Sequence, residues 1–270
     1  MTDRAVPERA VILAAGLGSR LRPLTDDRPK PLVPIFGVPL LHHALHQLEA
    51  AGVKRATIVV GYRKERIQKF FGQYFGDLEI TYCESGVFDR TGSAYSLWLA
   101  RDALMAGDCL LLEGDVFFER AVLDRVLSSR ESDVAAVAPF DETMEGSAVT
   151  LCAKNYVQDV RLKQTPADRQ TGATALYKTI NLFRFSADSL RQAVLPALDG
   201  LIRSGAVTAY TEQLLSMLAA QERLKLAAVR CDRLKWFEID KESDLQMAER
   251  QLTPNDLGDA AFSLRPALAI

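Results

Sequence analysis

A glycine-rich segment near the N-terminus contains residue types that proteins use to bind phosphate. Gly16, Gly18 and Arg20 stand within five residues of one another, directly after an apolar run. Glycines let backbone N–H groups approach an anion closely, and an arginine can hold a phosphate with two hydrogen bonds. Lys30 follows in the same loop between two prolines, which restrict its backbone. These residues predict a phosphate-binding loop.

Three interpretations of this loop are open from the residues alone. A dinucleotide-binding fingerprint would need a third glycine where Leu21 stands, and an acidic end to the second strand where residues 59–61 read Val-Val-Gly. A P-loop would need Gly-Lys-Ser/Thr, which the segment lacks. A plain connecting turn is the third interpretation, but the basic side chains of Arg20, Arg22 and Lys30 favour a phosphate ligand.

Two aspartates far apart in the sequence each follow a segment with a buried character. Asp115 ends the run Leu-Leu-Leu-Glu-Gly-Asp, and Asp240 ends the run Trp-Phe-Glu-Ile-Asp. Magnesium prefers oxygen ligands and needs only one or two protein carboxylates when a substrate supplies phosphates. Simpler roles are open as well, because Asp115 could be a turn residue and Asp240 the N-cap of the helix that follows.

The elements that must position these side chains alternate along the first half of the chain. Strands are predicted over residues 10–15, 57–61, 78–83 and 109–113, and helices from Pro39 to about residue 52 and over 64–74 and 93–105. This alternation predicts an α/β fold with a doubly wound, mostly parallel mixed sheet flanked by helices. Ligands of such sheets bind at the carboxyl ends of the strands, where Gly16 and Asp115 both fall.

The pattern changes after residue 128, although no repeat or linker marks a boundary. Strands are predicted over residues 133–139, 148–153, 157–164, 178–185 and 224–230, and helices over 187–202, 210–221 and 241–251. We therefore expect a single domain over residues 1–270. Its nucleotide-binding half is expected at about 9–130, its acceptor-binding half at about 131–250, and a C-terminal tail at 251–270.

Composition and charge restrict the partners that we expect. The 33 basic and 35 acidic residues give a net charge of −2, which offers no electrostatic argument for binding nucleic acid or an anionic membrane. The four cysteines form no Cys-x-x-Cys pair, which indicates a reducing compartment. No apolar run suits a signal peptide or a membrane span. We expect a cytoplasmic protein.

The loop motif resembles a known family. Residues 14–25, Ala-Ala-Gly-Leu-Gly-Ser-Arg-Leu-Arg-Pro-Leu-Thr, and the following Arg-Pro-Lys-Pro-Leu resemble the signature of nucleoside-triphosphate transferases that make sugar nucleotides and CDP-alcohols. The resemblance implies a Rossmann-like, nucleotide-diphospho-sugar transferase-like fold and a magnesium-dependent nucleotidyl transfer. It implies catalytic roles for Arg20 and Lys30 and a Mg²⁺ site at Asp115 and Asp240. The predicted nucleotide contacts are Leu13, Ala14, Ala15, Gly16, Gly18, Ser19, Arg20, Ser93 and Ser96.

Further segments resemble the CTP:phosphocholine cytidylyltransferases and their phosphonate-activating relatives. These segments are residues 92–98, 113–116, 178–185, 210–212 and 236–245. The resemblance implies CTP as the favoured nucleotide, a small phosphorylated or phosphonate acceptor and pyrophosphate release. A homodimer is a further expectation, with the C-terminal tail as one candidate contact. A sugar-1-phosphate uridylyl-, thymidylyl- or guanylyltransferase is the alternative. A catalytically silent nucleotide-binding regulatory subunit is another, but such proteins tend to lose a metal carboxylate or the loop lysine, and this chain keeps them.

Four side chains of the second half are predicted to hold the acceptor. Lys178 could meet the acceptor's phosphate, or it could be a solvated lysine at a strand end. Glu212, with Tyr210 and Trp236, could hold a cationic amine by charge and cation–π attraction. The alternative for these three is a carboxylate at a helix start beside core aromatics.

Other polar groups have a structural alternative too. Ser93 and Ser96 open a predicted helix beside the site, where they could bind a base or ribose or simply cap the helix. His42 and His46 have the i, i+4 spacing that can bind metal, but no glutamate adjoins His42 as zinc hydrolases require. We expect them and His43 to be solvated or partly buried structural histidines on a surface helix.

Overall fold

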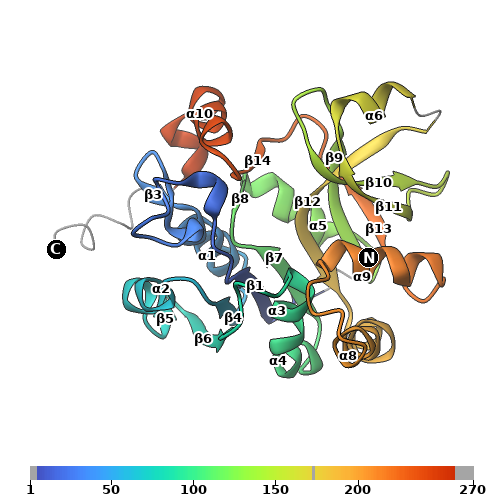
Figure 1. Cartoon of the computed structure of the whole chain (residues 1–270), viewed down its shortest axis with the longest axis horizontal. Helices are drawn as coiled ribbons and strands as arrows, with labels where there is room; N and C mark the ends of the chain where they lie inside the picture. The colour runs from blue at the N-terminus through green and yellow to red at the C-terminus, as the bar shows by residue number, and fades with distance from the viewer. Residues whose placement is uncertain (1–4, 172–173, 259–270) are drawn as a thin grey trace.

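The computed structural model describes residues 5–171 and 174–258, and its first half contains the predicted parallel sheet (Figure 1). The parallel strands are β1 (Arg9–Ala14), β4 (Arg55–Val60), β6 (Leu78–Glu84) and β7 (Cys109–Glu113). Strand β1 lies between β4 and β7, and β6 adjoins β4. The predicted fold class is confirmed, with each strand within two residues of its expected bounds.

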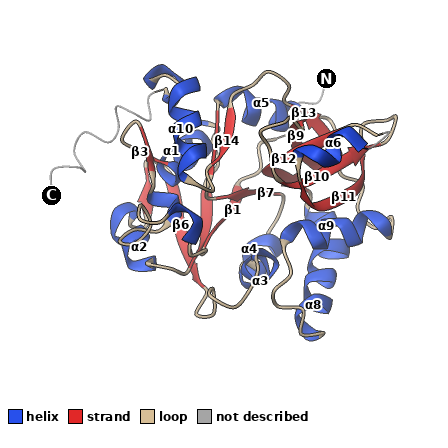
Figure 2. Ribbon diagram, turned by 45° about the horizontal axis from the view of Figure 1, so that its top comes forward, coloured by secondary structure: helices blue, strands red, loops and turns tan. Residues whose placement is uncertain are grey.

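Helices cover both faces of this sheet, as Figure 2 shows. One face is covered by α1 (Leu40–Ala50), α2 (Lys64–Phe71) and α5 (Arg120–Ser128), and the other by α3 (Ser93–Leu99) and α4 (Arg101–Met105). Val11 and Leu13 pack toward α3, while Ile12 and Ala14 pack toward α1. Because successive side chains of a strand alternate between faces, burial on both faces explains the uninterrupted apolar run of β1.

The second half extends the same sheet with antiparallel strands. Strand β12 (Leu176–Phe185) pairs with β7, and beyond it lie β10 (Gly146–Leu151) and β11 (Val157–Gln164). Strand β9 (Val134–Pro139) also pairs with β12, and β13 (Ala227–Arg230) runs parallel to β9. The helices here are α6 (Pro166–Thr171), α7 (Ala187–Ser189), α8 (Leu195–Arg203) and α9 (Thr211–Ala220). One ten-stranded sheet thus supports both halves.

Short elements were not predicted from the sequence. They are β2 (Pro34–Ile35), β3 (Val38–Pro39), β5 (Tyr74–Phe75), β8 (Val116–Phe118) and β14 (Trp236–Glu238), together with helices α5 and α6. Strands of two or three residues are too short to produce a recognisable period. The antiparallel pair β8–β14 joins the two halves of the chain.

The C-terminal region packs against the loop side of the molecule. Helix α10 (Glu242–Gln251) is followed by a 3₁₀ turn at Pro254–Leu257, and Leu252 and Leu257 are buried. Of the predicted tail at 251–270, residues 259–270 lie outside the described residues. Within the described part of the chain, no helix combines the length and apolar character needed to cross a membrane.

Helix α1 is not the expected surface helix, and of its three histidines, expected to be solvated or partly buried, only His46 is partly buried rather than fully buried. His42 and His43 are both buried, with exposed fractions of 4% and 1%. The His43 ring stacks on Phe117 at a centroid distance of 4.3 Å, and its Nε2 lies 2.8 Å from the Phe118 carbonyl oxygen. The reason is that α1 packs between the parallel sheet and β8, so both of its sides are covered. Burial lowers the pKa of both histidines to about 4.

These pKa values predict an acid-sensitive stability. Between pH 6.5 and about 4 the unfolded chain binds protons that the folded chain excludes, so the free energy of unfolding falls as the pH falls. Each histidine should contribute roughly 1.4 kcal/mol per pH unit. Urea unfolding of His42→Phe should show a shallower pH slope than the wild type. An unchanged slope in His42→Phe would contradict the prediction.

Candidate active site

The glycine loop is shaped to pack against the lysine that follows it. Gly18 has a φ of 61°, and a Cβ at this position would lie 2.9 Å from the Lys30 Cβ atom. A side chain would therefore meet both backbone strain and a steric clash. The Thr25 hydroxyl donates to the Gly18 carbonyl oxygen at 2.8 Å and closes the loop. The glycine thus brings the loop and Lys30 together.

A large cleft runs along the carboxyl ends of β1 and β7. Its volume is about 1700 Å³, and its walls come from both halves of the chain. Every side chain or loop residue predicted for the site lines it: Leu13, Ala14, Ala15, Gly16, Gly18, Ser19, Arg20, Lys30, Ser93, Ser96, Asp115, Lys178, Tyr210, Glu212, Trp236 and Asp240. The position agrees with the rule that open α/β sheets bind ligands at the carboxyl ends of their strands.

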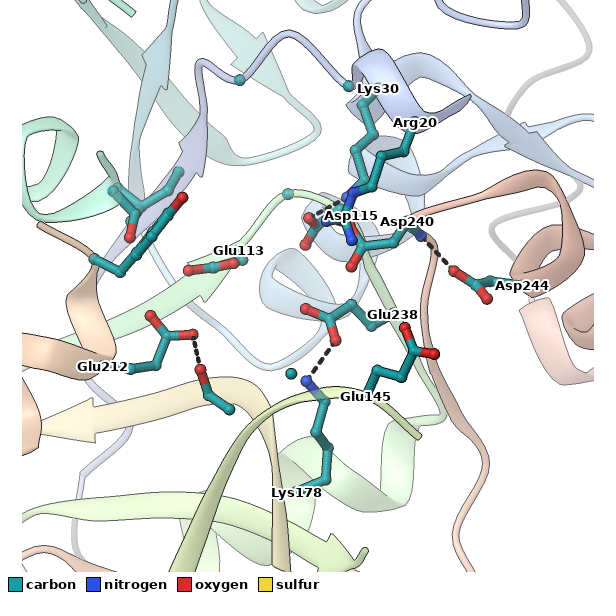
Figure 3. A pocket seen from close by; sticks show the side chains of 18 of the residues that line it. Arg20, Lys30, Glu113, Asp115, Glu145, Lys178, Glu212, Glu238, Asp240 and Asp244 are labelled. Atoms are coloured by element: carbon teal, nitrogen blue, oxygen red, sulfur yellow. Dashed lines mark hydrogen bonds and ion pairs between the residues drawn. The ribbon is translucent and has the colours of Figure 1, made fainter. Parts of the chain in front are cut away.

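Lys30 connects the loop to both aspartates (Figure 3). Its Nζ atom lies 2.6 Å from Asp115 Oδ2 and 2.6 Å from Asp240 Oδ1, and Arg20 Nη2 lies 2.8 Å from Asp240 Oδ1. Burial alone would lower the pKa of Lys30, but the two carboxylates outweigh burial and raise it above its ordinary value. The ammonium group is therefore a fixed positive charge.

The two aspartates meet because β8 and β14 pair. The Ile239 N–H donates to the Asp115 carbonyl oxygen at 3.0 Å, at the end of this ladder. Asp240 is not the N-cap of α10, since the Asp244 carboxylate accepts from the backbone N–H groups of Asp240 and Lys241 at 2.9 Å each. The Asp240 side chain is instead free to face Lys30 and Arg20. Asp115 does lie in a turn, but its carboxylate also faces the cleft.

Lys178 is buried, which contradicts the alternative of a solvated lysine. It is 5% exposed, and its Nζ atom lies 2.8 Å from Glu238 Oε2. Burial alone would lower the pKa of Lys178, but the Glu238 carboxylate outweighs burial and raises it. A Cβ on Gly146 would lie 3.0 Å from the Lys178 Nζ, so this glycine leaves room for the ammonium group. Lys178 therefore presents a second fixed positive charge to the cleft.

Ser93 and Ser96 line the cleft, and their nucleotide contacts stay a prediction. The Ser93 hydroxyl oxygen accepts from the Thr211 backbone N–H at 2.8 Å and so ties α3 to the start of α9. It does not cap its own helix, whose N-cap is Gly92. Ser96 is buried beside it. Ser93 thus fixes the wall of the cleft on which Glu212 stands.

The predicted amine-binding group is only partly assembled. The Glu212 carboxylate accepts from the Ser147 hydroxyl at 3.1 Å. Tyr210 is 56% exposed at the rim, while Trp236 is half-buried in β14 against the core. Among the described residues, no ring contact joins these two aromatic side chains. The structure brings Glu212 into the cleft without enclosing it in an aromatic cage.

Glu238 and Glu113 are carboxylates of the cleft that had no role assigned from the sequence. Glu238 lies between Trp236 and Asp240, and the alternation of a strand would have indicated that these residues share a face. Glu113 ends β7 and lines the cleft, and its side chain has no hydrogen bond or ion pair within the described residues. Burial, with repulsion from Glu212 and Asp115, raises the pKa of Glu113 well above its ordinary value. No sequence pattern marks this residue beyond its place two residues before Asp115.

Comparison with known proteins identifies relatives across most of the chain. A sequence model of the nucleotidyl transferase family matches residues 9–145. A CMP-5′-(3-aminopropyl)phosphonate synthase of Streptomyces rubellomurinus is 36% identical over 259 residues, which are 94% of this chain and 40% of that protein. A UTP–glucose-1-phosphate uridylyltransferase of Haloferax volcanii is 33% identical over 209 residues, which are 73% of this chain and 84% of that protein.

A solved structure shows the same fold. The CTP:phosphocholine cytidylyltransferase of Streptococcus pneumoniae aligns with a TM-score of 0.74 at 21% sequence identity, covering 91% of this chain and 99% of that one. The present chain spans 40% of the length of its Streptomyces relative. The resemblance predicted from the glycine loop is confirmed at the level of the family. The chain belongs to the nucleotidyl transferase family.

Proposed function

We propose that the protein is a cytidylyltransferase, which transfers CMP from CTP to a small phosphorylated or phosphonate acceptor and releases pyrophosphate. One observation carries the proposal: Lys30 joins the glycine loop to two carboxylates at the floor of the cleft. Lys178 supplies a second positive charge farther along the same cleft. Two anionic substrates thus have separate positive charges to bind.

The residues of the chain suit transfer by positioning and charge neutralisation. An oxygen of the acceptor's phosphate or phosphonate forms a bond to the α-phosphorus, and the bond from that phosphorus to the pyrophosphate oxygen breaks. Arg20 and Lys30 stabilise negative charge on the nucleotide's phosphates, and Lys178 orients the acceptor's phosphorus group. Fixed charges of this kind favour the transition state because they need no rearrangement when the reaction occurs.

We propose that Mg²⁺ is held by Asp115 and Asp240. Asp115 Oδ1 is buried without a hydrogen-bond partner among the described residues, and the same two carboxylates already share a cation in Lys30. No group of three or more metal-binding side chains is present in residues 5–171 and 174–258, so this pair would rely on substrate phosphates as further ligands. When bound, the ion would supply charge stabilisation to the reacting phosphates.

The choice of CTP and of a phosphonate acceptor is supported by the relatives. The Streptomyces protein that matches 94% of this chain is a synthase of a CMP-phosphonate. The Haloferax protein that matches 73% of it is a uridylyltransferase acting with glucose 1-phosphate. A sugar-1-phosphate nucleotidyltransferase is therefore the second candidate.

Pyrophosphate release measured across nucleotides and acceptors tests this proposal. The protein would be incubated with Mg²⁺, each of CTP, UTP, dTTP, GTP and ATP, and either aminoalkylphosphonates, phosphocholine or hexose 1-phosphates. We expect release with CTP and a phosphonate or phosphate ester. Release only with UTP or dTTP and a hexose 1-phosphate would establish the second candidate. Nucleotide binding without release under any combination would indicate a catalytically silent subunit.

A further inference from the structure

We propose that Glu113 and Glu212 together bind a primary ammonium group of the acceptor. The inference rests on the proposed function. It specifies how the end of the acceptor opposite its phosphorus group is bound. It assigns a role to Glu113, which no feature of the transfer reaction requires. The acceptor would be an aminoalkyl phosphonate or phosphate, with its phosphorus group toward Lys178 and its amine toward these two carboxylates.

The charges of the cleft leave these two carboxylates without a basic partner. Lys30 pairs with Asp115 and Asp240, and Lys178 pairs with Glu238. Within the described residues, Glu212 accepts only from the Ser147 hydroxyl, and Glu113 has no polar partner. Both residues are partly exposed and line the cleft, so a ligand bound there can reach their carboxylates. A cation from the substrate would supply the missing charge.

The two side chains lie on facing walls of the cleft. Glu113 comes from the end of β7 and Glu212 from the first turn of α9, and Figure 3 shows both carboxylates directed into the same part of the cleft. Both residues line the same cleft. Two carboxylates held close together repel one another in a low-dielectric interior. A cation between them would turn this repulsion into two attractions.

The chemistry of the pair favours a primary over a quaternary amine. A primary ammonium has three N–H donors, which could be shared between the two carboxylates, whereas a quaternary ammonium has none and is recognised mainly by aromatic faces. Tyr210 lies at the rim and Trp236 packs against the core, so neither completes an aromatic cage around Glu212. The Ser147 hydroxyl also fixes the direction of the Glu212 carboxylate.

The spacing suits a short linker between amine and phosphorus. Glu113 stands two residues before Asp115, so their Cα atoms can be no more than about 7 Å apart. Two or three carbons between nitrogen and phosphorus span roughly 4–5 Å, given single bonds of about 1.5 Å. A linker of this length is of the same order as that separation, which favours a short acceptor over a long one.

Relative turnover of matched acceptors tests the inference. With CTP and Mg²⁺, kcat/KM for pyrophosphate release would be compared between 3-aminopropylphosphonate, propylphosphonate and phosphocholine. We expect the wild type to favour the primary amine over both others by on the order of tenfold or more, the value of a hydrogen-bonded charge. Glu113→Gln and Glu212→Gln should each reduce this preference to about threefold or less, mainly through KM. The preference is a ratio, so it does not depend on the fraction of folded enzyme.

A matched variant distinguishes direct contact between a carboxylate and the amine from the general electrostatic field of the cleft. Glu145 lines the same cleft, but its side chain is 66% exposed and pairs with Lys241 at 3.6 Å. Glu145→Gln removes the same charge and should keep the wild-type preference. A wild type that does not prefer the primary amine, or a full preference in Glu113→Gln and Glu212→Gln, would overturn this inference alone. Absence of pyrophosphate release with every acceptor would overturn the proposed function and this inference with it.

Discussion

Replacing Asp115 by asparagine is expected to slow pyrophosphate release by on the order of a thousandfold, with the fold retained. Asparagine has nearly the same shape as aspartate, and its amide oxygen can still accept from Lys30, which now donates to Asp115 at 2.6 Å. The substitution removes the negative charge that the proposed magnesium site needs. The loss should appear in kcat, because this charge acts mainly in the transition state. Steady-state assays with CTP and a saturating acceptor would measure it.

Two further variants test whether this loss of turnover comes from the catalytic groups at the floor of the cleft. Lys30→Met should lose turnover to a similar extent, since it removes the charge that joins the loop to both aspartates. Asp141→Asn serves as a control, because Asp141 lines the cleft but bonds only within its own turn to Thr143. We expect near wild-type turnover in this control. Near-normal turnover in Asp115→Asn or Lys30→Met would mean that the catalytic groups lie elsewhere in the cleft.

A magnesium-dependent measurement adds a readout that is independent of turnover. A ligand that binds only the folded state raises its stability by mass action. In the presence of CTP, added Mg²⁺ should raise the unfolding temperature of the wild type. The rise should be much smaller in Asp115→Asn and unchanged in Asp141→Asn. An equal rise in all three proteins would place the metal away from Asp115.

The parallel half of the fold could be predicted because its strands and helices are long and periodic. The run from Ala10 to Ala14 is apolar throughout, which is typical of a strand buried on both faces. The periodic spacing of apolar residues in such elements is set by the local sequence, and the folded chain forms the strands and helices that it predicts. The long helix predicted over residues 93–105 is instead two helices, which meet at Ala100 with a ψ of 13°. No glycine or proline marks that break.

Contacts between distant residues could not be predicted in the same way. The residues alone identified Asp115 and Asp240 as separate candidates, and only the family resemblance placed them in one site, because their meeting depends on the three-residue ladder between β8 and β14. A ladder of that length has no period to recognise. The burial of His42 and His43 could likewise not be predicted. Strand β8 covers the second side of their helix, but the sequence of the helix alone looks amphipathic. Glu113 was missed because the lack of a polar partner for its carboxylate depends on how residues from distant parts of the sequence surround it.

Replacing Arg184 by methionine is expected to lower the free energy of unfolding by about 3 kcal/mol or more. Arg184 is 1% exposed in β12, and its guanidinium donates to four carbonyl oxygens at and beyond the C-terminal end of α5. The acceptors are Val126 and Leu127, at 2.9 and 3.0 Å, Ser129, at 2.9 Å, and Glu131. The last carbonyls of a helix have no partners within the helix, and a positive charge there also opposes the negative end of its dipole. Methionine would fill much of the space and leave these acceptors, which are buried or partly buried apart from Glu131 at the surface, without the donors of the guanidinium.

The size of this effect distinguishes a buried arginine from an exposed one. In a protein of this length, a loss of about 3 kcal/mol lowers the unfolding temperature by roughly 6–12 °C. Arg191 offers the control, since its guanidinium also donates to a carbonyl oxygen, that of Met105, but at the exposed surface. Arg191→Met should change the stability by no more than about 0.5 kcal/mol. Equal losses in the two variants would show that the contacts of Arg184 with the end of α5 add little. A large loss in Arg184→Met alone would identify this side chain as the main polar link between β12 and α5, and so between the antiparallel half of the sheet and the helix that follows β8.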